Sequence, residues 1–351
     1  MSGILAKIGE DWFFPAAVLL ILFLLATASP LVPHTTGPDQ PPPFENYGRM
    51  INLKEAPALP AFLFRLLTIV FLTLLLSGLV INLQGLLKGQ WRVFPPGSAP
   101  AVPWGVAPVV KLALYFIALF LLLLRLEKIF LGLLGVAPRE IQSGLLLVNA
   151  FLQFAILLGL SIIFLRGYRP ARSAAFRPSS GKPVSLPALL PCPGPRELRI
   201  RVRQAFRGYI CFFPLLVILI LIAWGLTRIF DLPWQSHPLF HPLLERGSAP
   251  LLWPLLLVGI VLGPLAEELF FRGLLFPALA GRIREWGAVT VTAALFATLH
   301  FNWAGWIPIF GLGVLLARSY ARTGSLLVPV LIHGLHNALF LAFTILVYQL
   351  T

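Results

Sequence analysis

The side chains that could do chemistry lie in the C-terminal third of the chain, inside stretches that are otherwise apolar. They are two carboxylates, a guanidinium, two imidazoles and a carboxamide: Glu267, Glu268, Arg272, His300, His333 and Asn337. A charged side chain at the centre of a membrane helix costs about 2.5–3.5 kcal/mol on insertion scales. Such groups persist where they pair, face a cavity and perform a function. The pattern therefore predicts a polar site inside an apolar protein.

Three kinds of chemistry fit these groups. A glutamate and histidines can activate water and donate hydrogen bonds to a developing oxyanion. Two histidines and a carboxylate can also form a hydrolytic zinc site, so Glu267, His300 and His333 are the ligand set if a metal is bound. The zinc signature H-E-x-x-H of soluble enzymes is absent from the sequence. Finally, intramembrane glutamates can relay protons in a transporter.

Helical spacing sorts the polar groups into faces. Glu268 and Arg272 are four residues apart, so they share a face and can form an ion pair. Glu267 is rotated by about 100° from Glu268 and is free to point elsewhere. His333 and Asn337 are also four residues apart. The alternative interpretation is structural, with an ion pair between helices and an interhelical hydrogen bond in place of a site.

The depths of three groups provide an independent test of a shared site. At a rise of about 1.5 Å per residue, Glu267, His300 and His333 lie roughly 14, 18 and 12 Å from the inner ends of their expected helices. These depths fall in the cytoplasmic half of a hydrocarbon core about 30 Å thick. Three helices of alternating direction therefore bring the three groups to a similar level.

Composition identifies the class of protein that holds this site. Of the 351 residues, 58% are hydrophobic and 11% are charged, and the mean hydropathy is +0.88. A soluble domain carries about 25% charged residues. These values exclude a water-soluble enzyme, a disordered chain and a secreted disulfide scaffold, and they favour a polytopic membrane protein.

The expected fold is an all-α bundle of about eight to nine transmembrane helices, since a spanning helix needs about 20 apolar residues. Nine stretches approach that length: 12–32, 61–86, 106–126, 144–165, 208–227, 250–276, 288–304, 306–318 and 325–348. The first resembles a signal peptide, but a membrane helix is favoured because many spans follow it. The seventh and eighth are short and closely joined, so they could be one bent or re-entrant element.

Basic residues indicate the orientation. The net charge is +14, and ten of the 27 Lys and Arg residues lie in the stretch 166–207, with one acid, Glu197. Between apolar runs, this is typical of a cytoplasmic loop beside anionic headgroups, and we expect no nucleic-acid partner. Residues 196–207 have the pattern of an interfacial amphipathic helix. We expect the N-terminus inside and the C-terminus outside, in a bacterial cytoplasmic membrane.

The chain divides into three expected parts. Residues 1–165 form an N-terminal membrane module of about four helices. Residues 166–207 form the basic cytoplasmic loop with its amphipathic helix. Residues 208–351 carry the polar site and form the C-terminal membrane domain.

Three motifs in the last part resemble those of a known family. They are EExxxR at 267–272, FxxxH at 296–300 and HxxxN at 333–337. Together, in this order on apolar helices, they are similar to the motifs of the CAAX prenyl endopeptidase and bacteriocin-processing (CPBP, or Abi) family of intramembrane proteases. The resemblance covers about residues 208–350, which predicts a CAAX-protease-like core there and leaves residues 1–200 unexplained.

The resemblance implies an intramembrane endopeptidase that cuts a membrane-associated protein or peptide. By resemblance, Glu267 and His300 hold and activate the water, and His333 and Asn337 supply oxyanion donors. Arg272 keeps Glu268 charged behind them. Family members have been described both as metalloproteases and as enzymes with a glutamate-activated water, so zinc stays an open possibility and no cofactor is required.

Two other functions remain as alternatives. One is a non-catalytic membrane scaffold or immunity protein of the same fold, which binds a partner. The other is a proton-coupled transporter using Glu267 and Glu268, although the chain shows no inverted repeat. The motifs encode water activation and say nothing about the peptide that is cut, although a prenylated CAAX tail is the best-known family substrate.

Overall fold

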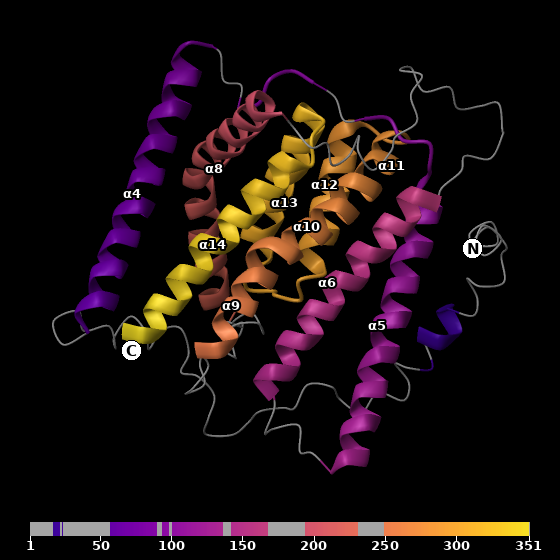
Figure 1. The fold of residues 1–351 in the computed structure, drawn as a ribbon. Helices are drawn as coiled ribbons and strands as arrows, with labels where there is room; N and C mark the ends of the chain where they lie inside the picture. The colour runs from indigo at the N-terminus through magenta and orange to yellow at the C-terminus, as the bar shows by residue number, and fades with distance from the viewer. Residues whose placement is uncertain are drawn as a thin grey trace.

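The computed structural model describes residues 17–21, 23, 57–89, 93–97, 100–135, 142–167, 194–230 and 249–350. In this part of the chain every regular element is a helix (Figure 1), which confirms the all-α fold. The N-terminal and middle helices are α4 (Ala58–Leu87), α5 (Val106–Leu134), α6 (Gln142–Gly167) and α8 (Pro195–Ile229). The C-terminal elements are α9 (Ala249–Leu257), η4 (Val258–Leu262), α10 (Gly263–Glu268), η5 (Leu269–Leu275), α11 (Phe276–Ala280), α12 (Glu285–Thr298), α13 (Trp306–Thr323) and α14 (Leu327–Leu350).

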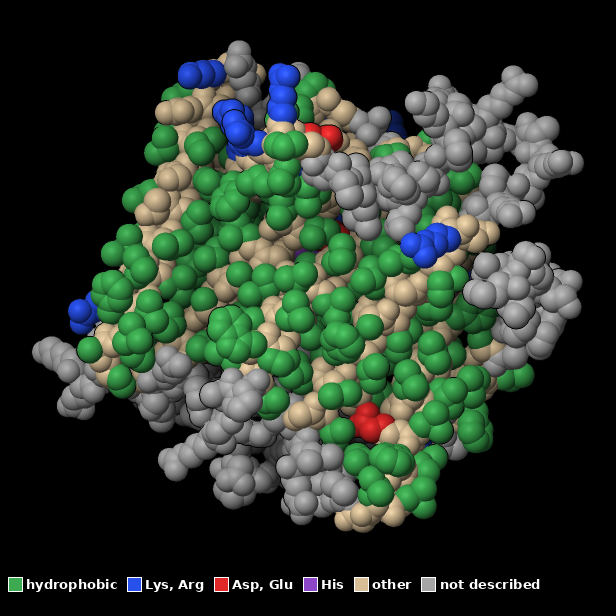
Figure 2. Space-filling view, viewed as in Figure 1, with side chains coloured by type: hydrophobic (Ala, Val, Ile, Leu, Met, Phe, Trp, Pro, Cys, Tyr) green, Lys and Arg blue, Asp and Glu red, His purple; other side chains and the backbone are tan. Residues whose placement is uncertain are grey.

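Six of these helical stretches are long and apolar enough to cross a membrane. They are 58–87, 106–134, 144–167, 195–229, 251–280 and 327–347. The exposed faces carry large apolar side chains over most of their length, as expected for surfaces in contact with lipid (Figure 2). The chain is therefore an integral membrane protein with a polytopic helical bundle. The first expected span, 12–32, lies largely outside the described residues.

The expected seventh and eighth spans are two separate helices that form a hairpin. Glu285, at the start of α12, pairs with Arg318 and Arg322 near the end of α13, so the two helices are antiparallel. Gly313 permits their close contact, because a Cβ atom there would lie 3.0 Å from the Cα atom of Ala293. The 14 residues of α12 span about 21 Å, which is less than a hydrocarbon core of about 30 Å. The 18 residues of α13 are also fewer than in any of the six long stretches. The two stretches are therefore separate helices and not one bent helix, while a re-entrant hairpin stays a prediction.

The described parts of the predicted basic segments, among them residues 194–207, lie at one end of the bundle, the upper end in Figure 1, which we call the basic end. It carries the last residues of α4 and α6, the first turns of α8 and the hairpin ends. Polar contacts join these segments: Arg201 donates to the carbonyl of Thr323 (3.1 Å), and Arg322 donates to that of Gly97 (3.4 Å). The helices alternate in direction, as the sequence predicts (Figure 1), and the cytoplasmic orientation of the basic end stays a prediction.

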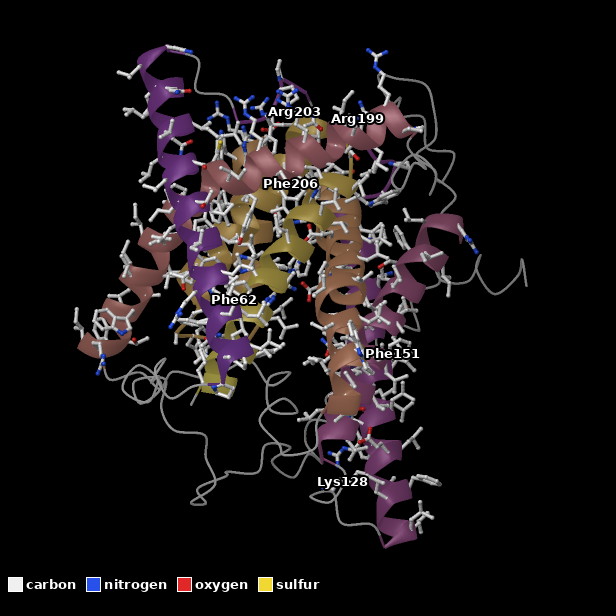
Figure 3. All side chains as sticks on the ribbon, turned by 60° about the vertical axis from the view of Figure 1, so that its left-hand side comes forward. Phe62, Lys128, Phe151, Arg199, Arg203 and Phe206 are labelled. Atoms are coloured by element: carbon white, nitrogen blue, oxygen red, sulfur yellow. The ribbon has the colours of Figure 1, made fainter. Side chains whose placement is uncertain are left out.

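The expected amphipathic helix and the span after it form one continuous helix, α8. Figure 3 shows its first part lying across the basic end before the helix turns down into the bundle. Pro214 lies inside the helix and cannot donate to the carbonyl of Ile210, which explains the bend. Helix α4 packs at this point: a Cβ atom at Gly78 would overlap that carbonyl oxygen, and Asn82 donates to the neighbouring carbonyl of Cys211 (2.8 Å).

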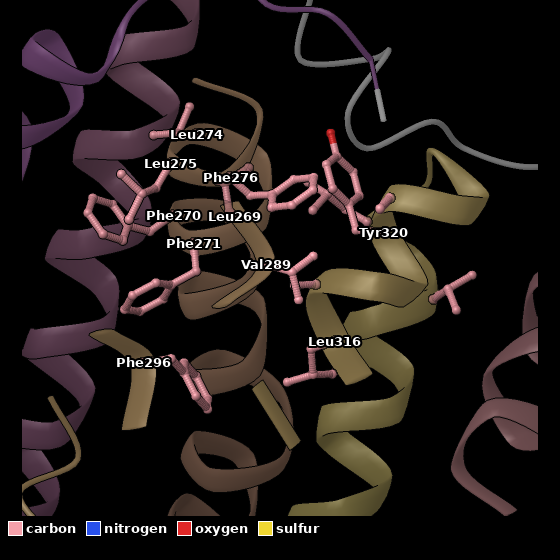
Figure 4. Close-up of a cluster of buried hydrophobic side chains, with 14 of the residues drawn as sticks. Leu269, Phe270, Phe271, Leu274, Leu275, Phe276, Val289, Phe296, Leu316 and Tyr320 are labelled. Carbon is pink, nitrogen blue, oxygen red and sulfur yellow. The ribbon is translucent and has the colours of Figure 1, made fainter. Parts of the chain in front are cut away.

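The core lies between α8, the helical stretch from α10 to α11, and the hairpin. Figure 4 shows its central cluster of buried aromatic and aliphatic side chains. Aromatic rings meet edge to face there, as in the pairs Phe271–Phe296 (5.4 Å between ring centroids) and Phe276–Tyr320 (6.1 Å). This packing fixes the helices that carry the polar groups of the site.

Candidate active site

The glutamates lie in a short α-helical segment, α10, between two π-helical turns, η4 and η5. Pro264 at the start of α10 has no N–H and leaves the carbonyl of Ile260 without its helical donor. Helix α14 packs at this carbonyl through Gly334, where a Cβ atom would lie 2.8 Å from the oxygen. Asn337 donates to the nearby carbonyl of Gly259 (2.8 Å). The π turns therefore hold Glu267 and Glu268 in fixed directions against α14, and π turns are frequent at functional sites.

Glu268 and Arg272 form a fully buried ion pair, as the i, i+4 spacing predicts. Nη1 of Arg272 lies 2.8 Å from Oε1 of Glu268, and both side chains are 0% exposed. Nη2 donates to the carbonyl of Gly313 in α13 (3.1 Å), and the guanidinium lies over the ring of Phe296 at 4.5 Å. Arg272 thus joins η5 to both helices of the hairpin.

His333 lies between the two glutamates. Its Nδ1 is 2.9 Å from Oε1 of Glu268, and its Nε2 is 3.8 Å from Oε2 of Glu267. Because a carboxylate oxygen held by Arg272 accepts hydrogen bonds, Nδ1 carries the proton that it donates to Glu268. This bond orients the ring so that Nε2 faces Glu267. A single water molecule can lie within hydrogen-bond distance of both Nε2 and the Glu267 carboxylate.

Glu267 is the less buried of the two glutamates. Its side chain is 17% exposed, whereas that of Glu268 is fully buried. In Figure 2 small areas of acidic and histidine side chains are visible among apolar side chains in the middle of one face. Both Oε2 of Glu267 and Oε2 of Glu268 are buried without a hydrogen-bond partner within the described residues. The free oxygen of Glu267 is therefore available to a water or substrate donor.

His300 follows the end of α12, in the turn of the hairpin. Its Nδ1 lies 2.6 Å from the carbonyl oxygen of Phe296, which can only accept, so Nδ1 is the protonated nitrogen. The Nε2 atom is left as the acceptor of the neutral ring. The ring of Phe296 contacts both imidazoles, with centroids 4.5 Å from His300 and 5.6 Å from His333. Both histidines therefore pack on one buried phenylalanine.

Glu267, His300 and His333, the ligand set named for the case that a metal is bound, do not come together as a zinc site. In the part of the chain that the structure describes, no three His, Cys, Asp or Glu side chains are placed to hold a metal ion. Glu267 and His333 face each other, but His300 does not complete a three-ligand group with them. The residues as arranged do not fit the zinc geometry of two histidines and one carboxylate.

Two residues of this region were not anticipated from the sequence. Tyr209 of α8 is buried, and its hydroxyl lies 3.3 Å from Nδ1 of His336. His336 also packs on the ring of Phe340 (4.5 Å between centroids). Gly313 contributes only its backbone carbonyl to Arg272, so its side chain offered no signal.

Comparisons with known proteins match the region of the chain that carries this site. The family described as type II CAAX prenyl endopeptidase Rce1-like matches residues 249–339, which contain all three motifs. A membrane-embedded CAAX protease, MroQ of Staphylococcus aureus (strain USA300), is 36% identical over 93 residues, which cover 24% of this chain and 37% of that protein. The putative membrane peptidase YdiL of Bacillus subtilis (strain 168) is 28% identical over 83 residues, which cover 24% and 34%. The resemblance inferred from the motifs is thus confirmed for the C-terminal region.

The comparisons leave most of the chain unmatched. An uncharacterized 24.3 kDa protein of Escherichia coli is 29% identical over 103 residues, which cover 28% of this chain and 48% of that protein. The chain therefore spans between a third and a half of the length of these curated relatives. No solved structure matches the chain. The N-terminal helices α4, α5 and α6 precede the region that the family model matches.

Proposed function

We propose that the chain is an intramembrane endopeptidase, which hydrolyses a peptide bond of a membrane-associated protein or peptide with a glutamate-activated water. The observation that carries this proposal is the arrangement of two glutamates around one imidazole, with Glu267 less buried than Glu268. A buried carboxylate that orients an imidazole, beside a second carboxylate with an unpartnered oxygen, is an arrangement suited to moving protons.

Glu267 acts as the general base in this proposal. Its carboxylate takes a proton from the water held between Glu267 and Nε2 of His333, and the hydroxide formed attacks the carbonyl carbon of the scissile bond. The same carboxyl group then returns the proton to the leaving amine. Glu268 does not take part directly, because it is fully buried and bonded to Arg272 and His333.

His333 stabilises the negative charge that forms on the peptide carbonyl oxygen. The cluster contains two carboxylates and one guanidinium, so one further proton shared between Glu267 and His333 makes it neutral. That proton can reside on His333, whose Nε2–H then donates to the oxyanion, while Glu268 balances the imidazolium. The positive charge that stabilises the oxyanion thus comes from His333 inside the protein, where no bulk water screens it.

His300 and Asn337 have supporting roles. The acceptor Nε2 of His300 can hold a proton of the attacking water, because Nδ1 is occupied by the Phe296 carbonyl. Asn337 fixes the π turn before α10 through Gly259 and so keeps Glu267 opposite His333. In the arrangement observed, its amide therefore positions the glutamates, and a role as oxyanion donor requires this bond to open.

The substrate class follows from where the site lies. The glutamates are in a transmembrane stretch, residues 251–280, so the peptide must enter the membrane or lie at its surface to reach them. The relatives named as a CAAX protease and a membrane peptidase support this substrate class. With the basic end inside, the site is closer to the cytoplasmic leaflet.

The test is a comparison of cellular protein termini between cells that express the wild-type chain and cells that express Glu267→Gln. The new termini that cleavage of the substrate creates should be missing in Glu267→Gln cells, because the amide cannot take a proton from water. Glu127→Gln is the matched control: Glu127 is a glutamate of α5 that accepts a bond from Asn149 and lies outside the site. Its cells should retain the wild-type termini.

The two alternative functions give different results in the same cells. Unchanged termini together with a retained cellular phenotype in Glu267→Gln would support the non-catalytic scaffold and reject the protease. A transporter would show pH-driven solute uptake in proteoliposomes that Glu267→Gln abolishes, with no difference in termini. The amounts of both variants in the membrane must match the wild type for these results to be compared.

A further inference from the structure

A pocket lies beside the first turns of α8, at the basic end of the bundle. Its volume is about 360 Å³. One wall comes from the segment before α5 and the other from α8. The lining residues are Val93, Phe94, Pro95, Ile200, Arg203, Gln204 and Arg207. The family resemblance does not reach this region, since the matched residues begin at 249.

Three arginines near the pocket, Arg201, Arg203 and Arg207 of α8, have different surroundings. Arg201 is turned into the bundle, where it donates to the carbonyl of Thr323 (3.1 Å) and pairs with Glu197 (3.2 Å). Arg203 and Arg207 are exposed, and they are one helical turn apart, so both stand on the face that lines the pocket. Arg201 thus holds the helix in place. Arg203 and Arg207 add two positive charges to the lining of the pocket, and Arg207 also contacts the side chain of Cys211 one turn further along α8.

The opposite wall is fixed to α8 by close packing. The ring of Phe94 lies against Gly208, where a Cβ atom would be only 2.6 Å from Cζ of the ring. Only glycine leaves room for this ring one residue beyond Arg207. The pocket is therefore a built feature, with an apolar wall of Val93, Phe94 and Pro95 facing the guanidinium groups.

The position of the pocket relative to the membrane suggests its ligand. Figure 3 shows Arg199 and Arg203 at the end of the bundle, with Phe206 on the same part of α8. Ile200 and Phe206 are 48% and 50% exposed, and Ile200 lines the pocket together with the two arginines. Guanidinium groups bind phosphate oxygens in a bidentate manner, and basic pockets on the cytoplasmic side of membrane proteins suit anionic headgroups.

We propose that Arg203 and Arg207 form a binding site for the phosphate of an anionic phospholipid, such as phosphatidylglycerol. The two guanidinium groups bind the phosphate, and the wall of Val93, Phe94 and Pro95 contacts the apolar part of the lipid. The charge of the pocket matches this ligand, and its place at the end of a transmembrane helix puts it at the headgroup level. The site does not depend on the proposed protease activity.

The test measures binding of dioctanoyl phosphatidylglycerol to the full-length protein in detergent, by native mass spectrometry and titration. Arg203→Gln/Arg207→Gln should weaken binding about thirtyfold, the factor expected from two basic side chains near an anionic lipid. The matched control is Arg196→Gln/Arg199→Gln, which removes two exposed charges from the same helix outside the pocket. It should change the dissociation constant by less than about threefold.

Further arms separate a lipid site from general electrostatic attraction. Dioctanoyl phosphatidylcholine should bind weakly, and inorganic phosphate at millimolar concentration should not compete. Arg203→Lys/Arg207→Lys keeps the charge and should give an intermediate loss, which provides a second result if the Gln variant does not fold. An equal loss in the Arg196/Arg199 variant, or full competition by inorganic phosphate, would overturn the proposal.

Discussion

Replacing Arg272 with Met removes the guanidinium that the structure places on Glu268, and it tests the energetic basis of the site. In the wild type this side chain makes a 2.8 Å ion pair, a 3.1 Å bond to the carbonyl of Gly313 and a cation–π contact with Phe296. Breaking a buried pair from one side costs about 3–5 kcal/mol, because the remaining charge stays buried. The free energy of unfolding of Arg272→Met should therefore fall by about 4 kcal/mol.

The double variant Glu268→Gln/Arg272→Met separates the charge from the packing. It removes both charges and keeps side chains of similar volume, so it should recover at least about 1–2 kcal/mol of the loss. Reversible unfolding in mixed micelles, followed by tryptophan fluorescence, measures the stability of the four proteins in this cycle. Arg272→Lys keeps the charge but lacks the fork that reaches Gly313, so its loss should be intermediate.

The cycle also has a functional outcome. Glu268→Gln/Arg272→Met should fold but hydrolyse peptide poorly, because a neutral amide in place of the Glu268 carboxylate no longer balances an imidazolium at His333. If Arg272→Met lowers the free energy of unfolding by less than about 1 kcal/mol, the pair is not buried as described and the reasoning fails.

Three further perturbations test the surroundings of the site. Gly334→Ala should destabilise the protein by about 1–3 kcal/mol, because the new methyl group would lie 2.8 Å from the Ile260 carbonyl, whereas Gly225→Ala meets open space and should be neutral or stabilising in thermal unfolding. Asn337→Leu leaves the Gly259 carbonyl without its donor, which should lower the free energy of unfolding by about 1–3 kcal/mol and remove most of the activity. Asn82→Leu should lower the melting temperature to a similar extent but retain activity. Equal loss of activity in both variants would contradict the positioning role of Asn337. Treatment with a zinc chelator should leave hydrolysis intact in proteoliposomes, since the set of two histidines and one carboxylate is not assembled among the described residues, and loss of activity that added zinc restores would refute this.

The local part of the site was predictable from the sequence because it depends on helical spacing. Glu268 and Arg272 are four residues apart on one helix, and the structure confirms their ion pair. The estimated depths also brought Glu267 and His333 to the same level, and their side chains face each other at 3.8 Å. The membrane helices were predictable for the same reason, because the length of an apolar stretch depends only on the local sequence.

The contacts between helices were not predictable in the same way. The bond from His333 to Glu268 joins residues that are 65 positions apart, and no spacing rule selects which of two adjacent glutamates an imidazole will contact. Asn337 was expected to serve the oxyanion, but its amide is bonded to Gly259 in a π turn. Pro264 was visible in the sequence, yet the π turns depend on how α14 packs at the carbonyl that the proline leaves free.

Two proline sites show a shared construction that the sequence did not reveal. At Pro214 in α8 and at Pro264 in α10, a glycine of a neighbouring helix packs on the carbonyl four residues earlier, and an asparagine of that helix donates to a carbonyl close by. The polar backbone atoms freed by proline are thereby covered within the membrane. The same device attaches α4 to α8 and α14 to the helix of the site.

The most direct test of the central claim is the rate at which purified protein in proteoliposomes cleaves a peptide identified from the cellular comparison. With Glu267 as the base beside His333, Glu267→Gln should reduce the rate constant by at least about a hundredfold, the lower range for general base catalysis, with unchanged thermal stability. A rate within about tenfold of the wild type would contradict the account, because the water would then be activated by another group.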